Sequence, residues 1–455
     1  MSDNFLSHFG SFYFIGICGV SMSALARFCV LNKKKTGGSD RDLSGADVLR
    51  QFGIKVFPSG TTALAGYDAV VYTDAIERGD EELKLARALK KTVIPRARFL
   101  AAVADCFSQV VAVAGCHGKT TCTAMLASIF SSAGRRFSAH IGGNSVQFSN
   151  FCSFGNDWFI TEACEYKKNF LALRPDIAVV TSTESDHLEC YGGADDLFSC
   201  YRKFASRARS AVAMYGDRLA GEVGAVTFGG DENADFSAAE ISGGKGAYSF
   251  TLSAFGRETG RVNLRVLGRH NVFNALAAAA AAYCSGVEGE DIVRGLEQFE
   301  GVERRMQLLG KYGGARCVAD YAHHPTEIAA ALKTAEKITE GKLFVIFQPH
   351  TYSRTKNLFG QFVNVLSGVR RLMIYRTFAA REYFDEEGCA FTLSRAVKKS
   401  RYGDRPEDIE RFISAAGEGD TVLFLGAGDI YFIARDIISV SGDLSLIHIS
   451  EPTRP

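Results

Sequence analysis

The chain has 455 residues, of which 47% are hydrophobic and 23% are charged. These proportions are those of an ordinary globular protein, and the length predicts about three domains. Lys and Arg number 52 against 51 for Asp and Glu, which gives a formal net charge of +1. Such a balance argues against a general nucleic-acid-binding protein or a membrane-surface protein.

The start of the chain lacks the basic and then apolar pattern of a signal peptide, and no apolar run is long enough to span a bilayer. The 12 cysteines are scattered and form no CxxC pair. We therefore expect free thiols in a reducing compartment. Together these features predict a cytoplasmic α/β protein that neither inserts into a membrane nor binds nucleic acid.

The first region alternates short apolar strands with helices, which predicts a parallel sheet with a ligand at its carboxyl edge. A strand at 12–15 leads into a glycine turn and then a helix at 21–31, an arrangement that can hold a diphosphate. Cys18 and Ser21 stand where a dinucleotide fingerprint has glycines, so plain tight-turn glycines are a rival interpretation. The candidate residues are Gly16, Cys18, Gly19, Ser39 and Asp40.

The segment Val110–Thr121, VVAVAGCHGKTT, has the order strand, glycine turn, lysine and helix that phosphate-binding loops share. Val113 occupies the position of the first Walker glycine, so the pattern is incomplete, and an ordinary strand–turn–helix with a surface lysine is the alternative. The strand and helix on either side favour a nucleoside triphosphate site. Its candidate residues are Gly115, Cys116, His117, Gly118, Lys119, Thr120 and Thr121.

Two further strands of this region end in side chains that suit a metal ion. A strand at 158–161 ends at Glu162, and a strand at 177–181 precedes His187 by a few residues. Carboxyl ends of parallel strands share one edge, so Glu162, His187 and Thr120 are predicted to hold Mg²⁺ beside the phosphates. Separately, each residue would be explained by solvation alone.

The central region closes with a polar, glycine-rich stretch at 229–261 that predicts a hairpin, followed by an alanine-rich helix. Asn271 and Asn274 lie at the start of this helix, where their amides suit contacts with a base. Capping of the helix is a serious alternative.

The pattern restarts near Gly301, which predicts a third α/β domain. Its strands at 316–320, 343–347 and 421–425 each run into polar or aromatic groups, which predicts a second site at the carboxyl edge. Arg305 lies in the preceding linker and either clamps phosphates or is simply solvated.

Nine ordered motifs between Phe12 and Asp436 resemble those of one family, the Mur ligases. They are GICGVSMSALA (16–26), AGCHGKTT (114–121), EACE (162–165), ESDHLE (184–189), GRHNVFNA (268–275), ERRMQ (303–307), DYAHHPTEI (320–328), FQPHTYSRT (347–355) and GAGDI (426–430). The resemblance implies a Rossmann-like UDP-substrate domain at 1–107, a central P-loop ATPase-like domain with a parallel sheet at 108–301, and a Rossmann-like amino-acid-binding domain at 302–443. Residues 444–455 fit no pattern and are predicted to be a disordered or non-native tail.

The resemblance also implies an ATP-dependent ligase of cytoplasmic peptidoglycan precursor synthesis, acting as a monomer or homodimer. It would join L-alanine to the carboxylate of UDP-N-acetylmuramate through an acyl phosphate. By resemblance, two Mg²⁺ ions would be held, one by Thr120 and Glu162 and one by His187. Asn271 and Asn274 would lie near adenine and Arg305 near the phosphates. Tyr321, His323 and Arg354 would orient alanine, and Lys119, His187 and His323 would be catalytic.

Local departures from the family pattern occur at Cys18, Ser21, Cys116, Cys164 and Thr351. Three alternatives stay open: a ligase that recycles a whole peptide onto UDP-N-acetylmuramate, a P-loop ATPase with another function, and, on the incomplete first glycine turn, a nicotinamide oxidoreductase. The motif QPHTYSRT resembles the alanine-adding members better than the recycling ones.

Overall fold

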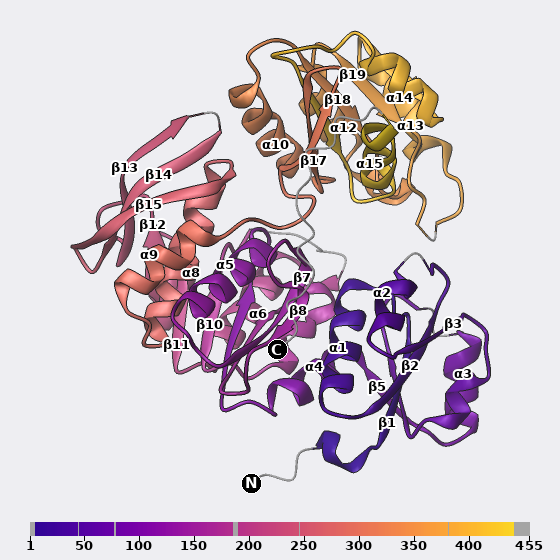
Figure 1. Ribbon diagram of the computed structural model, residues 1–455, viewed down its shortest axis with the longest axis vertical. Coiled ribbons are helices and arrows are strands. Elements are labelled where there is room, and N and C mark those ends of the chain that lie inside the picture. The colour runs from indigo at the N-terminus through magenta and orange to yellow at the C-terminus, as the bar shows by residue number, and fades with distance from the viewer. Residues whose placement is uncertain are drawn as a thin grey trace. The chain divides into compact units, whose positions relative to one another are not determined.

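The computed structural model describes residues 5–43, 45–76, 79–184, 190–244, 246–380 and 382–440. These residues form two compact units (Figure 1). The first contains the described residues up to 242 together with 249–265 and 270–302, and the second contains those in 243–248, 266–269 and from 303 onward. The predicted tail at 444–455 and His187 lie outside the described residues.

The first unit begins with a five-stranded parallel sheet of order β3-β2-β1-β4-β5. The expected alternation of strand and helix is confirmed here. The elements are η1 (Phe5–His8), β1 (Ser11–Ile15), α1 (Val20–Leu31), β2 (Lys35–Asp40), α2 (Ala46–Gln51), β3 (Lys55–Pro58), η2 (Ala63–Gly66), β4 (Ala69–Tyr72), α3 (Glu81–Ala88), β5 (Thr92–Pro95) and α4 (Arg96–Ala104).

The strand β1 is buried on both faces, as its unbroken apolar sequence predicts. Phe12 and Phe14 belong to a large cluster that includes residues of α1, α2 and α4, whereas Tyr13 and Ile15 pack with Leu83 of α3. Because successive side chains of a strand point to opposite faces, this division places helices on both sides of the sheet.

A ten-stranded sheet follows in the order β15-β14-β13-β12-β11-β10-β6-β9-β7-β8. The strand β6 pairs in parallel with β9 and β10, so all three end at the same edge. The elements are β6 (Gln109–Ala114), α5 (Lys119–Ser132), β7 (Phe137–Ser145), β8 (Ser149–Ser153), β9 (Trp158–Glu162), η3 (Tyr166–Ala172), β10 (Ile177–Val180), α6 (Ala194–Ala205), β11 (Ser210–Met214), α7 (Arg218–Val223), β12 (Val226–Gly229), β13 (Phe236–Gly244), β14 (Ala247–Ala254), β15 (Arg257–Leu267), α8 (His270–Cys284) and α9 (Gly289–Gln298).

Small residues let the helices around α5 approach one another closely. The alanines at 275–282 of α8 are fully buried, and α8 and α9 both pack on α5. A Cβ placed on Gly295 of α9 would lie 2.4 Å from Cα of Ile129 of α5, which leaves no room for a side chain. Ser128 Oγ donates a hydrogen bond of 2.7 Å to the carbonyl of Gly295. The helix that begins at the phosphate loop is thus fixed by its backbone contacts.

The second unit holds a six-stranded sheet of order β16-β17-β21-β18-β19-β20, parallel except for β16. Its elements are β16 (Gln307–Tyr312), β17 (Ala315–Asp320), α10 (Pro325–Ile338), β18 (Leu343–Phe347), α11 (Tyr352–Asn357), α12 (Phe359–Ser367), β19 (Leu372–Tyr375), η5 (Glu386–Gly388), α13 (Ala390–Ala396), β20 (Ser400–Gly403), α14 (Pro406–Ile413), β21 (Thr421–Leu425) and α15 (Ile430–Val440).

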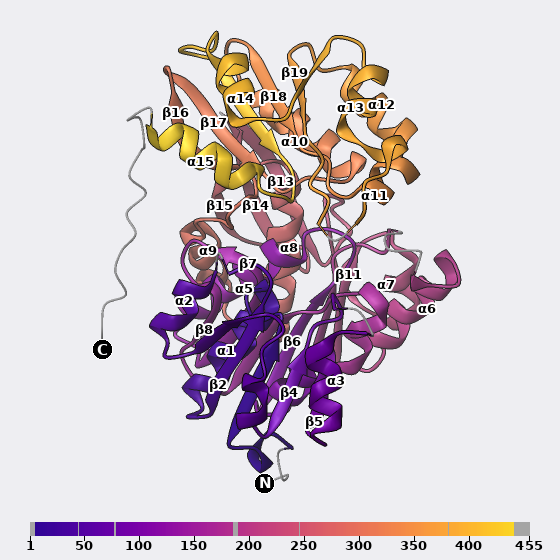
Figure 2. The ribbon, with the colours of Figure 1, turned by 90° about the vertical axis from the view of Figure 1, so that its right-hand side faces the viewer.

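Alternation along β18 divides this unit into two buried layers. Val345 and Phe347 pack with residues of α10, α12 and α13, whereas Phe344 and Ile346 pack with α14 and α15. Figure 2 shows α14 and α15 on one side of these strands and α12 and α13 on the other. The α/β class with parallel sheets is therefore confirmed. Among the described residues, no helix has the length and apolar character needed to cross a membrane.

We predict that Gly295→Ala lowers the free energy of unfolding by about 1–3 kcal/mol, because the new methyl group overlaps the backbone of α5. Gly221→Ala is the matched control, since Gly221 lies in α7 with no atom within 4 Å of the added Cβ. There alanine should stabilise by about 0.5–1 kcal/mol. Urea denaturation of both variants measures the two changes in the free energy of unfolding. A Gly295→Ala variant that is as stable as the native protein would contradict the close packing of α9 on α5.

Candidate active site

The predicted phosphate loop connects β6 to α5, as its sequence indicated. Gly115 and Gly118 have φ values of +128° and +79°, which disfavour any other residue. Their surroundings add a second restriction. A Cβ on Gly115 would lie 2.2 Å from Thr181 Oγ1, and one on Gly118 would lie 2.2 Å from Asn274 Oδ1. Gly118 is the N-cap of α5 and no side chain caps this helix, so its first N–H groups suit an anion.

Lys119 lies in the first turn of α5 with its ammonium group folded back onto the loop. Its Nζ donates to the carbonyls of Gly115 at 2.6 Å and Cys116 at 3.0 Å, and to Glu165 at 3.1 Å. Burial disfavours the ammonium form, but the charges of Glu165 and Glu162 outweigh it and raise the pKa of Lys119 above its ordinary value. The side chain is therefore a cation held at the place where phosphates are expected.

Glu165 is the residue of this site that sequence reasoning missed. It belongs to the EACE motif, and only 2% of its side chain is exposed, against 13% for Lys119. The Tyr191 hydroxyl donates to the Glu165 carbonyl. The signal in the sequence was a second carboxylate three residues after Glu162, which spacing alone does not direct toward Lys119.

Thr120 and Glu162 are brought together as predicted for metal ligands. Thr120 Oγ1 donates to Glu162 Oε2 at 2.8 Å, and Glu162 ends β9 at the same sheet edge as the loop. A Cβ on Gly142 would lie 1.9 Å from Glu162 Oε2, so a glycine is needed to make room for this carboxylate. Hydroxyl and carboxylate oxygens are the donors that Mg²⁺ prefers, so the pair fits the ion. The third predicted ligand, His187, lies outside the described residues.

Asn271 and Asn274 lie in the first turns of α8 and are both largely buried. Asn274 donates from Nδ2 to Asn271 Oδ1 at 2.9 Å. The contact of Asn274 with Gly118 places this pair beside the phosphate loop. The two amides therefore lie next to the loop. Their contact with adenine stays a prediction.

The predicted UDP site consists of a loop held to the end of β2. The backbone N–H groups of Gly16 and Ile17 donate to the Ser39 carbonyl at 2.8 and 3.0 Å, and Cys18 N donates to Asp40 Oδ2 at 2.9 Å. Gly19 is the N-cap of α1, which has no side-chain cap. The Ser39 hydroxyl faces away from this loop, because it is buried and donates to Glu82.

Ser21, one of the departures from the glycine pattern, bonds to the central region. Its Oγ lies 2.9 Å from His140 Nε2, and the Nδ1 of that ring lies 2.9 Å from Thr161 Oγ1. Burial, together with the charge of Arg96, lowers the pKa of His140 to about 3. The neutral ring thus links α1 to the strands β7 and β9.

In the second unit, the predicted alanine-binding residues lie within one cluster. His323 Nδ1 is 2.9 Å from the carbonyl of Tyr321, so this nitrogen carries the proton of the neutral ring and Nε2 remains an acceptor. The rings of Tyr321 and His350 lie 5.3 and 5.7 Å from that of His323. Burial lowers the pKa of His323 below its ordinary value, although Glu327 opposes the shift.

Arg354 reaches this cluster through His350. Its Nη1 lies 3.2 Å from His350 Nδ1, which accepts because a guanidinium has only donors. Burial, His323 and Arg354 together lower the pKa of His350 to about 4. Thr351 lies between the two with φ of +66°, a strained value for a β-branched residue. The Thr351 N–H donates a hydrogen bond of 2.9 Å to the Phe378 carbonyl.

The second histidine of the HHPTE sequence has a structural explanation. His324 is the N-cap of α10, and its Nδ1 accepts from Thr326 N at 3.4 Å. Glu327 accepts from the N–H groups of both histidines. Arg305 stacks at 5.4 Å on the Tyr321 ring and lies 4.0 Å from Glu327. Of the two histidines, His323 is therefore the one presented to the cluster.

Three family models match the chain in order. They are described as "Mur ligase family, catalytic domain" at residues 11–108, "Mur ligase middle domain" at 113–282, and "Mur ligase, glutamate ligase domain" at 304–428. The UDP-N-acetylmuramate–L-alanine ligase of Clostridium acetobutylicum is 35% identical over 445 residues, covering 94% of this chain and 97% of the relative.

Two solved structures extend the comparison. The UDP-N-acetylmuramate-alanine ligase of Thermotoga maritima superposes with a TM-score of 0.83 at 26% identity, covering 95% of this chain and 99% of that one. A murein peptide ligase of Psychrobacter arcticus has a TM-score of 0.72 at 23% identity, covering 96% and 100%. The second likeness concerns the fold alone.

We predict that Lys119→Met lowers the free energy of unfolding by about 3–5 kcal/mol, because it leaves the Glu165 carboxylate buried without its cation. The double variant Lys119→Met, Glu165→Gln should regain most of this stability while remaining without ligase activity. Urea denaturation and turnover measure the two effects separately.

Lys168→Met is the matched control, since the ion pair of Lys168 with Asp196 lies at the surface and its loss should change stability little. A single Lys119→Met variant as stable as the control would contradict the assigned role of Glu165.

Proposed function

This chain belongs to the Mur ligase family, and from that premise we propose that it joins L-alanine to the carboxylate of UDP-N-acetylmuramate at the expense of ATP. The observation that carries the proposal is the similarity over nearly the full length to the Clostridium acetobutylicum ligase. The residues around Lys119 and around His323 supply the groups that such a reaction needs. The twelve cysteines, all free thiols, are consistent with the cytoplasm as the place of this reaction, and we expect a monomer or homodimer.

The reaction needs activation because a carboxylate is a poor electrophile. A carboxylate oxygen of UDP-N-acetylmuramate attacks the γ-phosphorus of ATP, and ADP leaves. The amine of L-alanine then attacks the acyl phosphate carbon, the amine gives up its proton, and inorganic phosphate leaves. The products are the amide, ADP, phosphate and one proton, so atoms and charges balance.

Lys119 and the first N–H groups of α5 would stabilise the charge of the transferring phosphoryl group. Lys119 must then exchange its loop carbonyls for phosphate oxygens, and Glu165 keeps the side chain charged while it does so. Thr120 and Glu162 would hold one Mg²⁺ and His187 a second, and the ions would offset phosphate charge. Asn271 and Asn274 would contact adenine, and Arg305 the phosphates.

His323 and Arg354 would act on the amino acid. The neutral His323 ring presents Nε2 as an acceptor, which suits removal of a proton from the amine of alanine. Arg354 would pair with the alanine carboxylate, and Tyr321 would orient it. In the first region, Gly16, Cys18, Gly19 and Asp40 would bind the UDP group, with Ser39 supporting the loop through its carbonyl.

The second candidate is a ligase that attaches a whole peptide instead of alanine. It would use the same phosphate chemistry, and the Psychrobacter arcticus structure shares the fold. The two candidates differ only in the amine acceptor. The test is therefore one of acceptor choice.

We expect phosphate release with ATP and UDP-N-acetylmuramate to require L-alanine. Its kcat/KM should exceed that of glycine by about 10-fold or more, since one methyl group discriminates at about this level. It should also exceed that of an L-alanyl tripeptide, whose alanine has its carboxyl group in a peptide bond and so offers Arg354 no carboxylate there. Preference for the tripeptide would establish the recycling reaction instead. Phosphate release that needs no amine would indicate an ATPase of other function.

Arg354 is the residue that would bind the carboxylate of the amino acid. Loss of one charge-assisted pair should cost about 2–4 kcal/mol, or roughly 30- to 1000-fold in affinity. Arg354→Ala should therefore raise the KM for L-alanine by this factor while changing those for ATP and UDP-N-acetylmuramate little. Alaninamide, which lacks the carboxylate, should react poorly with the native enzyme and lose little more with the variant.

Lys356→Ala is the control, because Lys356 lies on the same helix, α11, and pairs with Asp385 and Glu387 near the surface. It should leave all three KM values unchanged. Equal weakening of all three substrates by Arg354→Ala would show that Arg354 does not anchor the carboxylate.

A further inference from the structure

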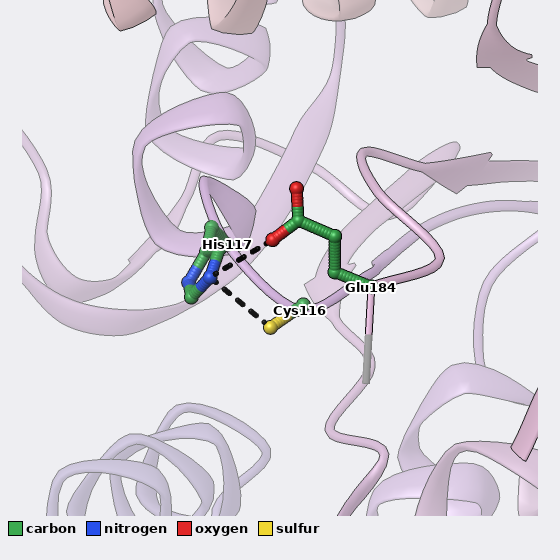
Figure 3. A group of neighbouring side chains, drawn as sticks. All are labelled: Cys116, His117 and Glu184. Carbon is green, nitrogen blue, oxygen red and sulfur yellow. Dashed lines mark hydrogen bonds and ion pairs between the residues drawn. The ribbon is translucent and has the colours of Figure 1, made fainter. Parts of the chain in front are cut away.

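A thiol, an imidazole and a carboxylate lie close together at the phosphate loop (Figure 3). Cys116 and His117 are neighbours in the loop itself, and Glu184 follows β10. We propose that Cys116, His117 and Glu184 form a binding site for one thiophilic divalent cation, of which Zn²⁺ is the type. This site is separate from the oxygen pair Thr120 and Glu162 to which we assign Mg²⁺.

The distances between the donor atoms approach those of a zinc centre. Cys116 Sγ lies 3.2 Å from His117 Nε2, and His117 Nε2 lies 3.6 Å from Glu184 Oε2. One donor atom of each residue lies within 4.8 Å of the other two. Tetrahedral zinc with bonds of about 2.0–2.3 Å separates its ligands by about 3.3–3.6 Å. Two of the three distances between donor atoms thus nearly match those of a zinc centre. A small rotation of the Glu184 side chain would bring its carboxylate to the required distance from Cys116 Sγ.

The solvent exposure of the three side chains would also allow an ion to enter from solution. Cys116 is buried, with 8% exposure, and so holds its sulfur in place. The side chains of His117 and Glu184 are 33% and 66% exposed, so one side of the site is open. In Figure 3 the imidazole lies between the thiol and the carboxylate, and all three point toward one another. Three protein ligands leave a fourth position for water.

The chemistry of the donors distinguishes this site from one for magnesium. Thiolate sulfur is a soft ligand and imidazole nitrogen a borderline one, and the two together favour Zn²⁺ or Co²⁺, whereas Mg²⁺ prefers oxygen ligands and keeps several waters. A threonine in place of Cys116, as the family pattern often has, would remove the soft donor. The site is therefore a property of this chain's loop.

Binding has a defined proton balance. The Cys116 thiol loses its proton to solvent when sulfur bonds to the cation, while Glu184 binds as a carboxylate and His117 as the neutral ring. One proton is released for each thiol that ligates, so the affinity must increase with pH. No oxidant or reductant takes part.

The test is a titration of the full-length, nucleotide-free protein with Co²⁺ and with Zn²⁺. Co²⁺ bound to a thiolate absorbs in the near ultraviolet, and Zn²⁺ should abolish this band by displacement. The native protein should show one such site, retained in excess Mg²⁺. Cys116→Ser should lose the band, and Glu184→Gln should weaken Zn²⁺ binding, measured against a chromophoric chelator, by about 10- to 100-fold or more.

Cys284→Ser is the control, because Cys284 is a more exposed thiol than Cys116 and lies at the end of α8, outside the phosphate loop. It should leave both the band and the affinity unchanged. Circular dichroism verifies that each variant is folded, and Glu184→Gln, at an exposed position, keeps the test valid if Cys116→Ser unfolds. Absence of a thiolate band in the native protein, or its persistence in folded Cys116→Ser, would show that the three groups are only hydrogen-bonded neighbours.

Discussion

The ion pair of Lys119 with Glu165 is the interaction on which the phosphate loop depends. Lys119 is a largely buried cation in the absence of substrate, and an unpaired buried charge costs several kcal/mol. Glu165 and two loop carbonyls supply the compensation. The same contacts fold the side chain back onto the loop, and under the proposed function phosphate oxygens would replace the loop carbonyls as its partners. Under that proposal, stability would favour the contacts of Lys119 with the loop, whereas catalysis would require the lysine to leave them.

The position of this pair follows from the order of strands in the central sheet. Parallel pairing of β6 with β9 and β10 brings the phosphate loop, Glu162 and the segment after Val180 to one edge. Glycines then decide how closely these groups approach. Gly118 admits the Asn274 amide and Gly142 admits the Glu162 carboxylate. The order of the strands thus brings these groups to one edge, and glycines at 118 and 142 leave the space that the neighbouring side chains occupy.

Much of this arrangement could be predicted from sequence because it depends on local patterns. The apolar run before Gly115 predicted β6, and residues that follow such runs were expected at the sheet edge, which brings Thr120 and Glu162 together. The same argument predicted a site at the edge of the third sheet, whereas the choice of Tyr321, His323 and Arg354 within it came from the resemblance to the Mur ligases. Long-range partners were not predictable, since spacing along the chain does not encode them. Glu165 meets Lys119 across 46 residues, and Glu82 meets Ser39 across 43.

Two departures of this chain from its family's pattern, Ser21 and Cys116, are matched by neighbours that contact the altered side chain. Ser21, at a position where glycine was expected, meets His140, and that ring in turn meets Thr161. A glycine at residue 21 would leave one nitrogen of a buried imidazole without this partner, which is costly. Cys116 similarly lies beside His117 and Glu184. A substitution inside a loop is tolerated when its new polar group is satisfied locally, because the backbone conformation of the loop is then undisturbed. By this reasoning Ser21 and His140 form a coupled pair, and changing both residues should cost less than the sum of the two single changes.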